Sequence, residues 1–160
     1  MGVCRIPRPR DPAAAARAAV VELLFEYVDR LRDHFERVSH SFDLTPVQAK
    51  VLLSLDEPAP MRCLAESLGC DPSNVTGVVD RLQERGLLAR SEAPADRRVK
   101  FLQATPAGQR LRETLGLALF GDVPGMSGLA PAEIAKLQKA LEILCRSEAT
   151  PVSRAAEPAA

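Results

Sequence analysis

The sequence contains no Trp, and aromatic residues make up only 4% of its 160 residues. Proteins that stack the bases of single strands present several aromatic side chains, so the composition disfavours that class. No apolar run approaches the roughly 20 residues of a membrane span, and the N-terminus lacks the hydrophobic segment of a signal peptide. We therefore expect an aliphatic core, no membrane segment and a cytoplasmic location.

Motifs of catalysis and metal binding are also missing. There is no Gly-rich phosphate loop, no Gly-x-Ser-x-Gly turn and no His-Glu-x-x-His helix. No Cys-x-x-Cys pair occurs among the cysteines, which are Cys4, Cys63, Cys70 and Cys145. His34 and His40 are six residues apart in a predicted helix, so they fall on different faces. The sequence predicts no catalytic residue, no metal and no cofactor.

Net charge is also lacking, because 21 basic residues balance 21 acidic ones. A broad field that attracts nucleic acid is therefore excluded, and any such affinity must come from local patches. One patch lies between residues 87 and 101, where four basic side chains oppose Glu92 and Asp96, an excess of two. The four are Arg90, Arg97, Arg98 and Lys100.

Residues 71–86 have the ends and the periodicity of a helix. Asp71 can cap its first amides, Pro72 suits the first helical position, and Gly86 can take the left-handed conformation that ends a helix. One apolar stripe follows the spacing i, i+3, i+4, i+7: Val75, Val78, Val79 and Leu82. The opposite face is small and polar: Ser73, Asn74, Thr76, Gly77, Asp80 and Arg81.

A two-stranded hairpin is predicted directly after this helix, over residues 87–91 and 99–102, with Asp96-Arg97-Arg98 at its tip. A short amphipathic helix that ends at Gly69 precedes the helix over 71–86, so these two helices are joined by a short turn. A helix that fits a major groove, followed by a basic hairpin, is the layout of a winged helix-turn-helix.

The two ends of the chain are predicted to be helical and to pair with another subunit. A helix capped by Asp11 runs to about His40, and its apolar residues alternate steps of four and three: Val20, Leu24, Tyr27, Leu31, Phe35 and Val38. Near-heptad steps also follow Pro131. We expect a basic arm over 1–10, a helical dimerisation region over 11–43 and 106–147, a winged helix-turn-helix over 44–105 and a disordered tail over 148–160.

Several motifs in this order resemble those of the MarR family of bacterial transcription regulators. They are Leu44-Thr45-Pro46, Leu64-Ala65-Glu66-Ser67-Leu68-Gly69, Val75-Thr76-Gly77-Val78-Val79-Asp80-Arg81-Leu82, Arg85-Gly86-Leu87-Leu88, Asp96-Arg97-Arg98 and Thr105-Pro106-Ala107-Gly108. The resemblance implies a mainly α fold with a small β-hairpin wing and a homodimer. It also implies a repressor that leaves a pseudo-palindromic operator on double-stranded DNA when a small ligand binds or a cysteine is oxidised.

The resemblance assigns roles by position. The recognition helix would present Ser73, Asn74, Thr76, Gly77 and Arg81 to the major groove. The wing would present Arg97, Arg98 and Lys100, braced by Asp96, with the roles of Arg97 and Arg98 interchangeable. A phenolic or lipophilic effector would lie near His34, Phe35 and Phe42, residues that could equally serve core or dimer packing.

Two other readings of the sequence stay open. The recognition face could contact a protein partner instead of DNA, which the zero net charge allows. Cys4 could sense oxidants, although it precedes the first predicted helix. Asp80 and Glu84 would repel phosphate, so we expect them to pair with Arg81, Arg85 or an arginine of the wing.

Replacing Arg97 with Ala should weaken operator binding and reduce its dependence on salt, because one cationic contact with the DNA is lost. Gel shifts over a salt titration measure both quantities. An affinity that stays unchanged at every salt concentration would remove the wing from the mechanism.

Overall fold

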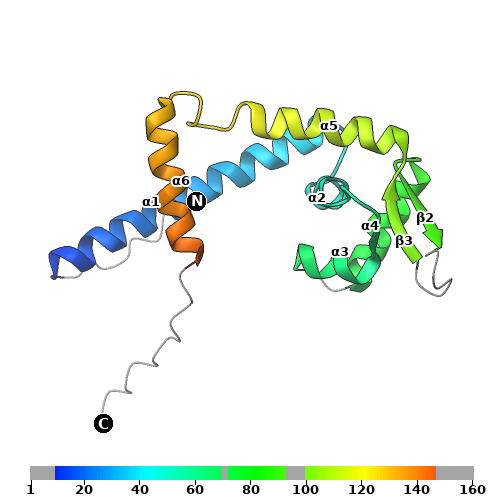
Figure 1. Ribbon diagram of the computed structural model, residues 1–160, viewed down its shortest axis with the longest axis horizontal. Coiled ribbons are helices and arrows are strands. Elements are labelled where there is room, and N and C mark those ends of the chain that lie inside the picture. The colour runs from blue at the N-terminus through cyan, green and yellow to red at the C-terminus, as the bar shows by residue number, and fades with distance from the viewer. Residues whose placement is uncertain (1–9, 70–71, 93–99, 147–160) are drawn as a thin grey trace, which may run out of the picture. The chain divides into compact units, whose positions relative to one another are not determined.

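The computed structural model describes residues 10–69, 72–92 and 100–146. These residues fall into two compact units, one ending at Pro124 and the other beginning at Gly125 (Figure 1). The expected arm up to residue 9, the expected tail, and Cys4, Cys70 and Asp71 lie outside the described residues.

The described chain contains six helices and three short strands, which confirms the predicted mainly α fold with a small sheet. The helices are α1 (Pro12–Ser41), α2 (Pro46–Ser54), α3 (Met61–Leu68), α4 (Pro72–Glu84), α5 (Pro106–Gly121) and α6 (Pro131–Arg146). The strands are β1 (Ala59–Pro60), β2 (Leu88–Glu92) and β3 (Lys100–Ala104). A search of the described helices for one long and apolar enough to cross a bilayer finds none.

Local sequence signals set most of the helix ends. The carboxylate of Asp11 accepts a hydrogen bond from the amide of Ala14 at 2.8 Å and so caps α1. Thr45 and Gln48 form a reciprocal capping box at the start of α2. Gly69 ends α3 in the left-handed conformation, with φ of 60°. These predicted ends are confirmed.

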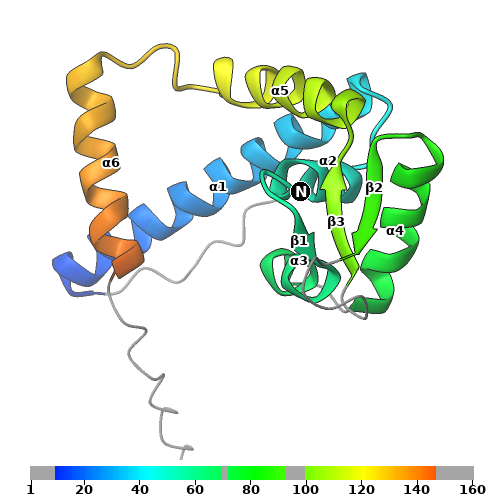
Figure 2. The same ribbon diagram turned by 45° about the vertical axis from the view of Figure 1, so that its right-hand side comes forward.

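The three strands form one antiparallel sheet in the order β1-β3-β2 (Figure 2). The predicted hairpin is present, but β2 begins one residue later than predicted and β3 continues to Ala104, because Leu88 pairs with Ala104. Strand β1 was not predicted, since two residues carry no alternating pattern. Its Pro60 pairs opposite Phe101 on the sheet edge, where a residue without an amide hydrogen is tolerated.

A buried aliphatic core fixes the orientation of α4. Val75, Val79 and Leu82 are at most 1% exposed, and Val78 packs against the same core. Helices α2 and α3, the sheet and α5 supply the rest: Leu44, Ala49, Val51, Leu52, Leu55, Leu64, Ala65, Leu87, Leu88, Leu102, Leu115 and Leu119. The apolar stripe predicted for this helix is thus confirmed, and its polar face is left outward.

The apolar seam predicted along α1 divides into two parts. Near its C-terminal end, Phe35 and Val38 pack against the core of their own unit. Further toward the N-terminus, the seam is less covered: Val20 is 52% exposed, and Leu24, Tyr27 and Leu31 are partly buried. Large apolar residues outside the predicted seam are exposed there as well, including Leu23 at 65%, Phe25 at 64% and Val28 at 54%. Helix α6 likewise exposes Ile143 and Leu144. Burying such surface from water is favourable, so these faces suit another apolar surface.

The start of α5 is fastened to the turn that ends α4. Gly86 has φ of 69°, and its carbonyl oxygen accepts a hydrogen bond of 2.7 Å from the hydroxyl of Thr105. The amide of Thr105 donates to the carbonyl of Leu87 at 3.0 Å. Gly108 lies so close that a Cβ there would overlap the Leu87 carbonyl oxygen. Only glycine allows this approach.

Replacing Gly108 with Ala should lower the free energy of unfolding by about 1–3 kcal/mol, the usual cost of overpacking. Gly116 lies in the same helix with no heavy atom within 4 Å of an added Cβ, so Gly116→Ala is the matched control. That control should be stabilising by about 0.5–1 kcal/mol through helix propensity. Urea unfolding measures both. Equal stability of the two variants would contradict a tight junction.

Candidate nucleic-acid interface

The outward face of α4 carries the predicted recognition residues. Thr76, Gly77 and Arg81 are exposed, on the side of the helix opposite the buried stripe. No heavy atom lies within 4 Å of a Cβ added at Gly77, so another molecule can approach the helix backbone there. Ser73 and Asn74 belong to α4, but their side chains lie outside the described residues. The face combines hydrogen-bonding groups with one cation.

The predicted tip of the wing lies outside the described residues, including Asp96, Arg97 and Arg98. Lys100 is the first residue of β3, where the backbone is described and the side chain is not. The brace assigned to Asp96 and the cationic contacts of this hairpin therefore stay predictions.

An ion pair joins the recognition helix to the wing. Arg90 of β2 donates from Nη2 to Oδ1 of Asp80 on α4 at 2.5 Å. Of the three kinds of partner expected for Asp80, namely Arg81, Arg85 or an arginine of the wing, the structure shows the last. It offsets a carboxylate that would repel phosphate, and it sets the position of β2 relative to α4.

A second arginine, directly after α4, ties the C-terminal end of that helix to the turn before α2. Arg85 donates from Nη1 to the carbonyl oxygen of Asp43 at 2.6 Å. Asp43 has φ of 54°, in the left-handed region that aspartate tolerates better than most residues. The sequence carries no signal for this contact, because its partners are separated by three helices.

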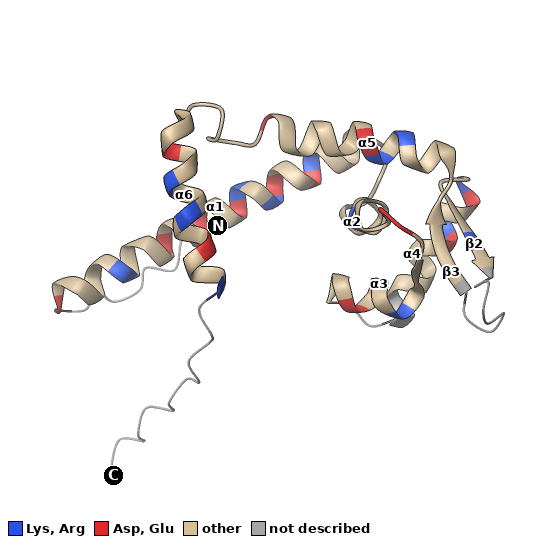
Figure 3. Cartoon of the chain, viewed as in Figure 1, with Lys and Arg blue, Asp and Glu red and all other residues tan. Residues whose placement is uncertain are grey.

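Charges of both signs are interspersed on the described residues (Figure 3). On α3, Arg62 donates to Glu66 at 2.9 Å, and this hydrogen bond, followed by the charge of Glu66, raises the pKa of Arg62. Because basic residues here have acidic neighbours, attraction to a nucleic acid rests on a few exposed cations such as Arg81.

The three residues predicted near an effector are used mainly for packing. Phe35 and Phe42 are partly buried against the core. The Nε2 of His34 lies 3.1 Å from the carbonyl oxygen of Leu119, so the ring must donate there, and it joins α1 to α5. These contacts correspond to the packing alternative, and the effector role of the three side chains stays a prediction.

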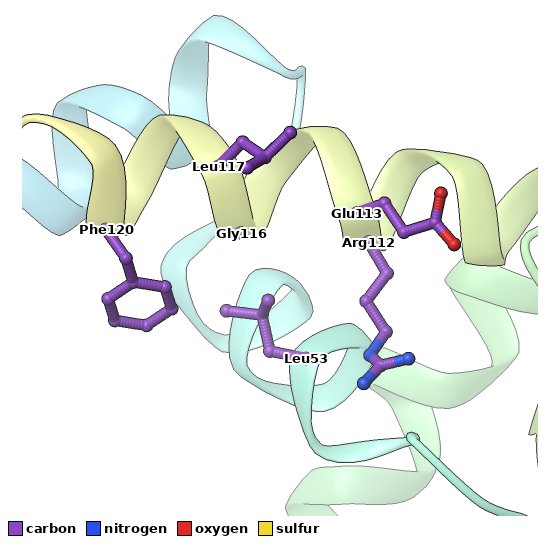
Figure 4. A pocket seen from close by; sticks show the side chains of 6 residues that line it. All are labelled: Leu53, Arg112, Glu113, Gly116, Leu117 and Phe120. Carbon is purple, nitrogen blue, oxygen red and sulfur yellow. The ribbon is translucent and has the colours of Figure 1, made fainter.

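A groove lies instead between α2 and α5, with a volume of about 690 Å³ (Figure 4). It is lined by Leu53, Arg112, Glu113, Gly116, Leu117 and Phe120. Leu117 is 76% exposed and Phe120 is 70% exposed, which is unusual for large apolar side chains. The sequence signal was present but missed: both residues fall off the buried side of α5 that contains Leu115 and Leu119.

The described part of the chain gathers no metal-ligand cluster and leaves two cysteines as free thiols. Nowhere in it do three His, Cys, Asp or Glu side chains lie close enough to share a metal ion. Cys63 and Cys145 are exposed free thiols.

Comparison with known proteins agrees with this arrangement. A family model described as "MarR family" matches residues 44–100, which span the capping box of α2, the recognition helix and the wing. Across more of the chain, the solved structure of BpsR from Bordetella bronchiseptica is 30% identical. The alignment covers 79% of this chain and 98% of BpsR, with a TM-score of 0.62. The chain belongs to the MarR family.

Other MarR-type proteins show the same relationship. YhbI of Bacillus subtilis, an uncharacterised helix-turn-helix transcriptional regulator, is 35% identical over 80 residues, which cover 49% of this chain and 52% of YhbI. CouR from Rhodococcus jostii RHA1, solved bound to p-coumaroyl-CoA, is 25% identical. Its alignment covers 82% of this chain and 94% of CouR, with a TM-score of 0.66. The chain spans about half the length of the curated relatives it matches.

A double-mutant cycle with Asp80→Asn and Arg90→Gln should give a coupling energy of about 0.2–1 kcal/mol, because the pair is partly exposed. The coupling should shrink as salt is added. Thermal unfolding of the four proteins provides the measurement. The exposed pair Asp29–Arg32 within α1 is the control, since it joins residues of one helix only. A coupling of zero at low salt would show that the pair does not hold the wing.

Proposed function

We propose that the protein is a homodimeric, sequence-specific regulator of transcription that binds double-stranded DNA. It acts as a repressor at a pseudo-palindromic operator and is released by a small-molecule effector. The observation that carries this proposal is the exposed face of α4: Thr76, Gly77 and Arg81 point outward from a helix whose other side is fully buried. The buried packing holds the helix rigidly, so its exposed side chains are presented to DNA in fixed positions.

The chemistry of the face suits a major groove. A threonine hydroxyl can donate to or accept from base edges, and an arginine can bind guanine or phosphate. Gly77 permits close approach of the backbone. Ser73 and Asn74 would extend this face, while Arg97, Arg98 and Lys100, braced by Asp96, would contact the minor groove or the phosphates. On this assignment residues 44–105 bind DNA, and residues 11–43 and 106–147 form the dimer.

Dimerisation is supported by the exposed apolar residues of α1 and α6. Phe25 and Leu23 are each more than half exposed on a helix of 30 residues, which one chain alone does not cover. A two-fold dimer buries the same surface of both subunits. It would place two recognition helices about 34 Å apart, one turn of B-DNA, which matches a pseudo-palindromic site.

The groove between α2 and α5 is our candidate for the effector. BpsR has its DNA binding regulated by 6-hydroxynicotinic acid, and CouR binds p-coumaroyl-CoA. The groove offers apolar walls at Leu53, Leu117 and Phe120 and one cation, Arg112. A phenolic or lipophilic compound fits this lining better than it fits the packed surroundings of Phe35 and Phe42.

Two other assignments follow from the proposal. A regulator of this kind needs no catalytic residues, so we assign no enzymatic activity. It acts where the chromosome lies, which is the cytoplasm of a bacterial cell. The rival function, contact between the face of α4 and a protein partner, would leave DNA unselected and is distinguished by the following experiment.

Selection from a random double-stranded library should enrich a two-fold symmetric sequence bound by the dimer. Arg81→Ala should weaken binding to that site by about 1–3 kcal/mol, the usual contribution of an arginine contact. Arg32→Ala, in the exposed part of α1, is the matched control and should bind normally. Phe25→Asp should shift the protein toward monomers in light scattering and weaken binding to the full site. If no sequence is enriched by the wild-type protein, the repressor proposal fails.

A further inference from the structure

Among the described residues, one cation lines the groove, and it is already paired with a carboxylate of the protein. Arg112, on α5, donates from Nη2 to Oδ1 of Asp56, which lies in the segment between α2 and β1. Figure 4 shows the Arg112 side chain extending from α5 past Leu53 toward that segment. The two residues are 56 positions apart in the sequence, so the contact joins separate parts of the fold.

The two partners differ in exposure to water. The side chain of Arg112 is 25% exposed, whereas that of Asp56 is 79% exposed. A largely buried guanidinium is costly without an anionic partner, but an exposed carboxylate regains its hydration when it leaves. An incoming anion can therefore replace Asp56 at little cost, provided that it also pairs with Arg112.

Asp56 precedes the elements that support the recognition helix. Three residues later, β1 pairs with β3 of the wing through Ala59 and Leu102. Five residues after Asp56, α3 begins, and it packs against α4. The contact with Arg112 fixes the start of this segment to α5. Its loss lets the segment between the groove and β1 move, and with it the elements that support the recognition helix α4.

We propose that the Arg112–Asp56 ion pair is a latch that an anionic effector opens. The carboxylate of the effector takes the place of Asp56 at Arg112, while its apolar part lies along Leu53, Leu117 and Phe120. Release of Asp56 loosens the segment leading to β1 and α3 and lowers affinity for DNA. This inference rests on the proposed function, because it assigns the regulation of the groove described there.

The lining also selects among anions. A planar guanidinium binds a carboxylate through two parallel hydrogen bonds, which a neutral amide or alcohol cannot reproduce. Glu113 lines the same groove and repels a second negative charge. The structure thus assigns the effector to the aromatic or aliphatic monocarboxylates, ahead of dicarboxylates and of uncharged analogues.

The first test compares naphthoate, naphthamide and naphthalenedicarboxylate on the purified full-length protein, by calorimetry and by release of the selected operator. Naphthoate should bind about tenfold or more tightly than naphthamide, as expected for a charge-assisted hydrogen bond. The dicarboxylate should also bind more weakly than naphthoate. Equal binding of the acid and the amide by the wild-type protein would overturn the inference.

The second test removes each side of the latch. Asp56→Asn should bind naphthoate several-fold more tightly than the wild type, because the competing carboxylate is gone, and should bind the operator more weakly without ligand. Arg112→Gln should lose the preference for acid over amide, and Arg112→Lys should retain only part of it. Glu57→Gln, which removes the exposed carboxylate next to Asp56 in the same segment, is the control and should change neither property.

Exchange of the two charges gives the sharpest discrimination. The double variant Asp56→Arg with Arg112→Asp should recover operator binding without ligand but should reject naphthoate. If Asp56→Asn binds naphthoate no more tightly than the wild type, the latch is excluded even when the operator is bound normally. If the wild type selects no operator, the repressor proposal fails without affecting the latch. Calorimetry of Asp56→Asn and the wild type then still tests whether naphthoate replaces Asp56 at Arg112.

Discussion

The contact between the first turn of α5 and the turn that ends α4 holds together the parts of the protein that face other molecules. Thr105 donates hydrogen bonds to the carbonyl oxygens of Gly86 and Leu87. Gly108 packs so closely on the Leu87 carbonyl that a Cβ there would overlap it. Because β2 begins at Leu88, this one junction fixes where the recognition helix ends, where the wing begins and in which direction α5 departs. A displacement of α5 must therefore also move the recognition helix α4, or it breaks the hydrogen bonds of this junction.

Several charged side chains of this protein hold separate elements of the fold together. With equal numbers of acidic and basic residues, no broad field draws the protein to DNA. Three described arginines instead connect elements: Arg90 joins the wing to α4, Arg85 joins α4 to the turn before α2, and Arg112 joins α5 to the segment before β1. In both ion pairs the carboxylate is the more exposed partner, so it is the side that can be exchanged at low cost.

Helices α2 and α5 both support the recognition helix α4 and line the proposed effector groove. Helix α2 contributes Val51 and Leu52 to the core and Leu53 to the groove. Helix α5 contributes Leu115 and Leu119 to the core and Phe120 to the groove. Since these side chains alternate on helices that are only a few turns long, a ligand in the groove touches the elements that support α4. Coupling between the two sites needs no additional domain.

The sequence by itself determined the features that depend on neighbouring residues. The caps at Asp11 and Thr45, the left-handed glycines 69 and 86 and the apolar stripe of α4 are local, because backbone hydrogen bonds and helical periodicity are decided within a few positions. The sequence also indicated that Asp80 needs an arginine partner, but it left Arg81, Arg85 and the wing open, and the structure selects Arg90.

Only the tertiary structure decided the features made by distant residues. Strand β1 exists because β3 offers it an edge, and nothing in Ala59 and Pro60 alone predicts a strand. The packing of Phe35 and Phe42 on the core, one of the two uses that the sequence left open for them, and the groove at Leu53 and Phe120 both depend on contacts between separate helices. The partners of Arg112 and Arg85 were equally hidden, because a side chain meets whichever group the packed backbone brings near it, and packing is a property of the whole core.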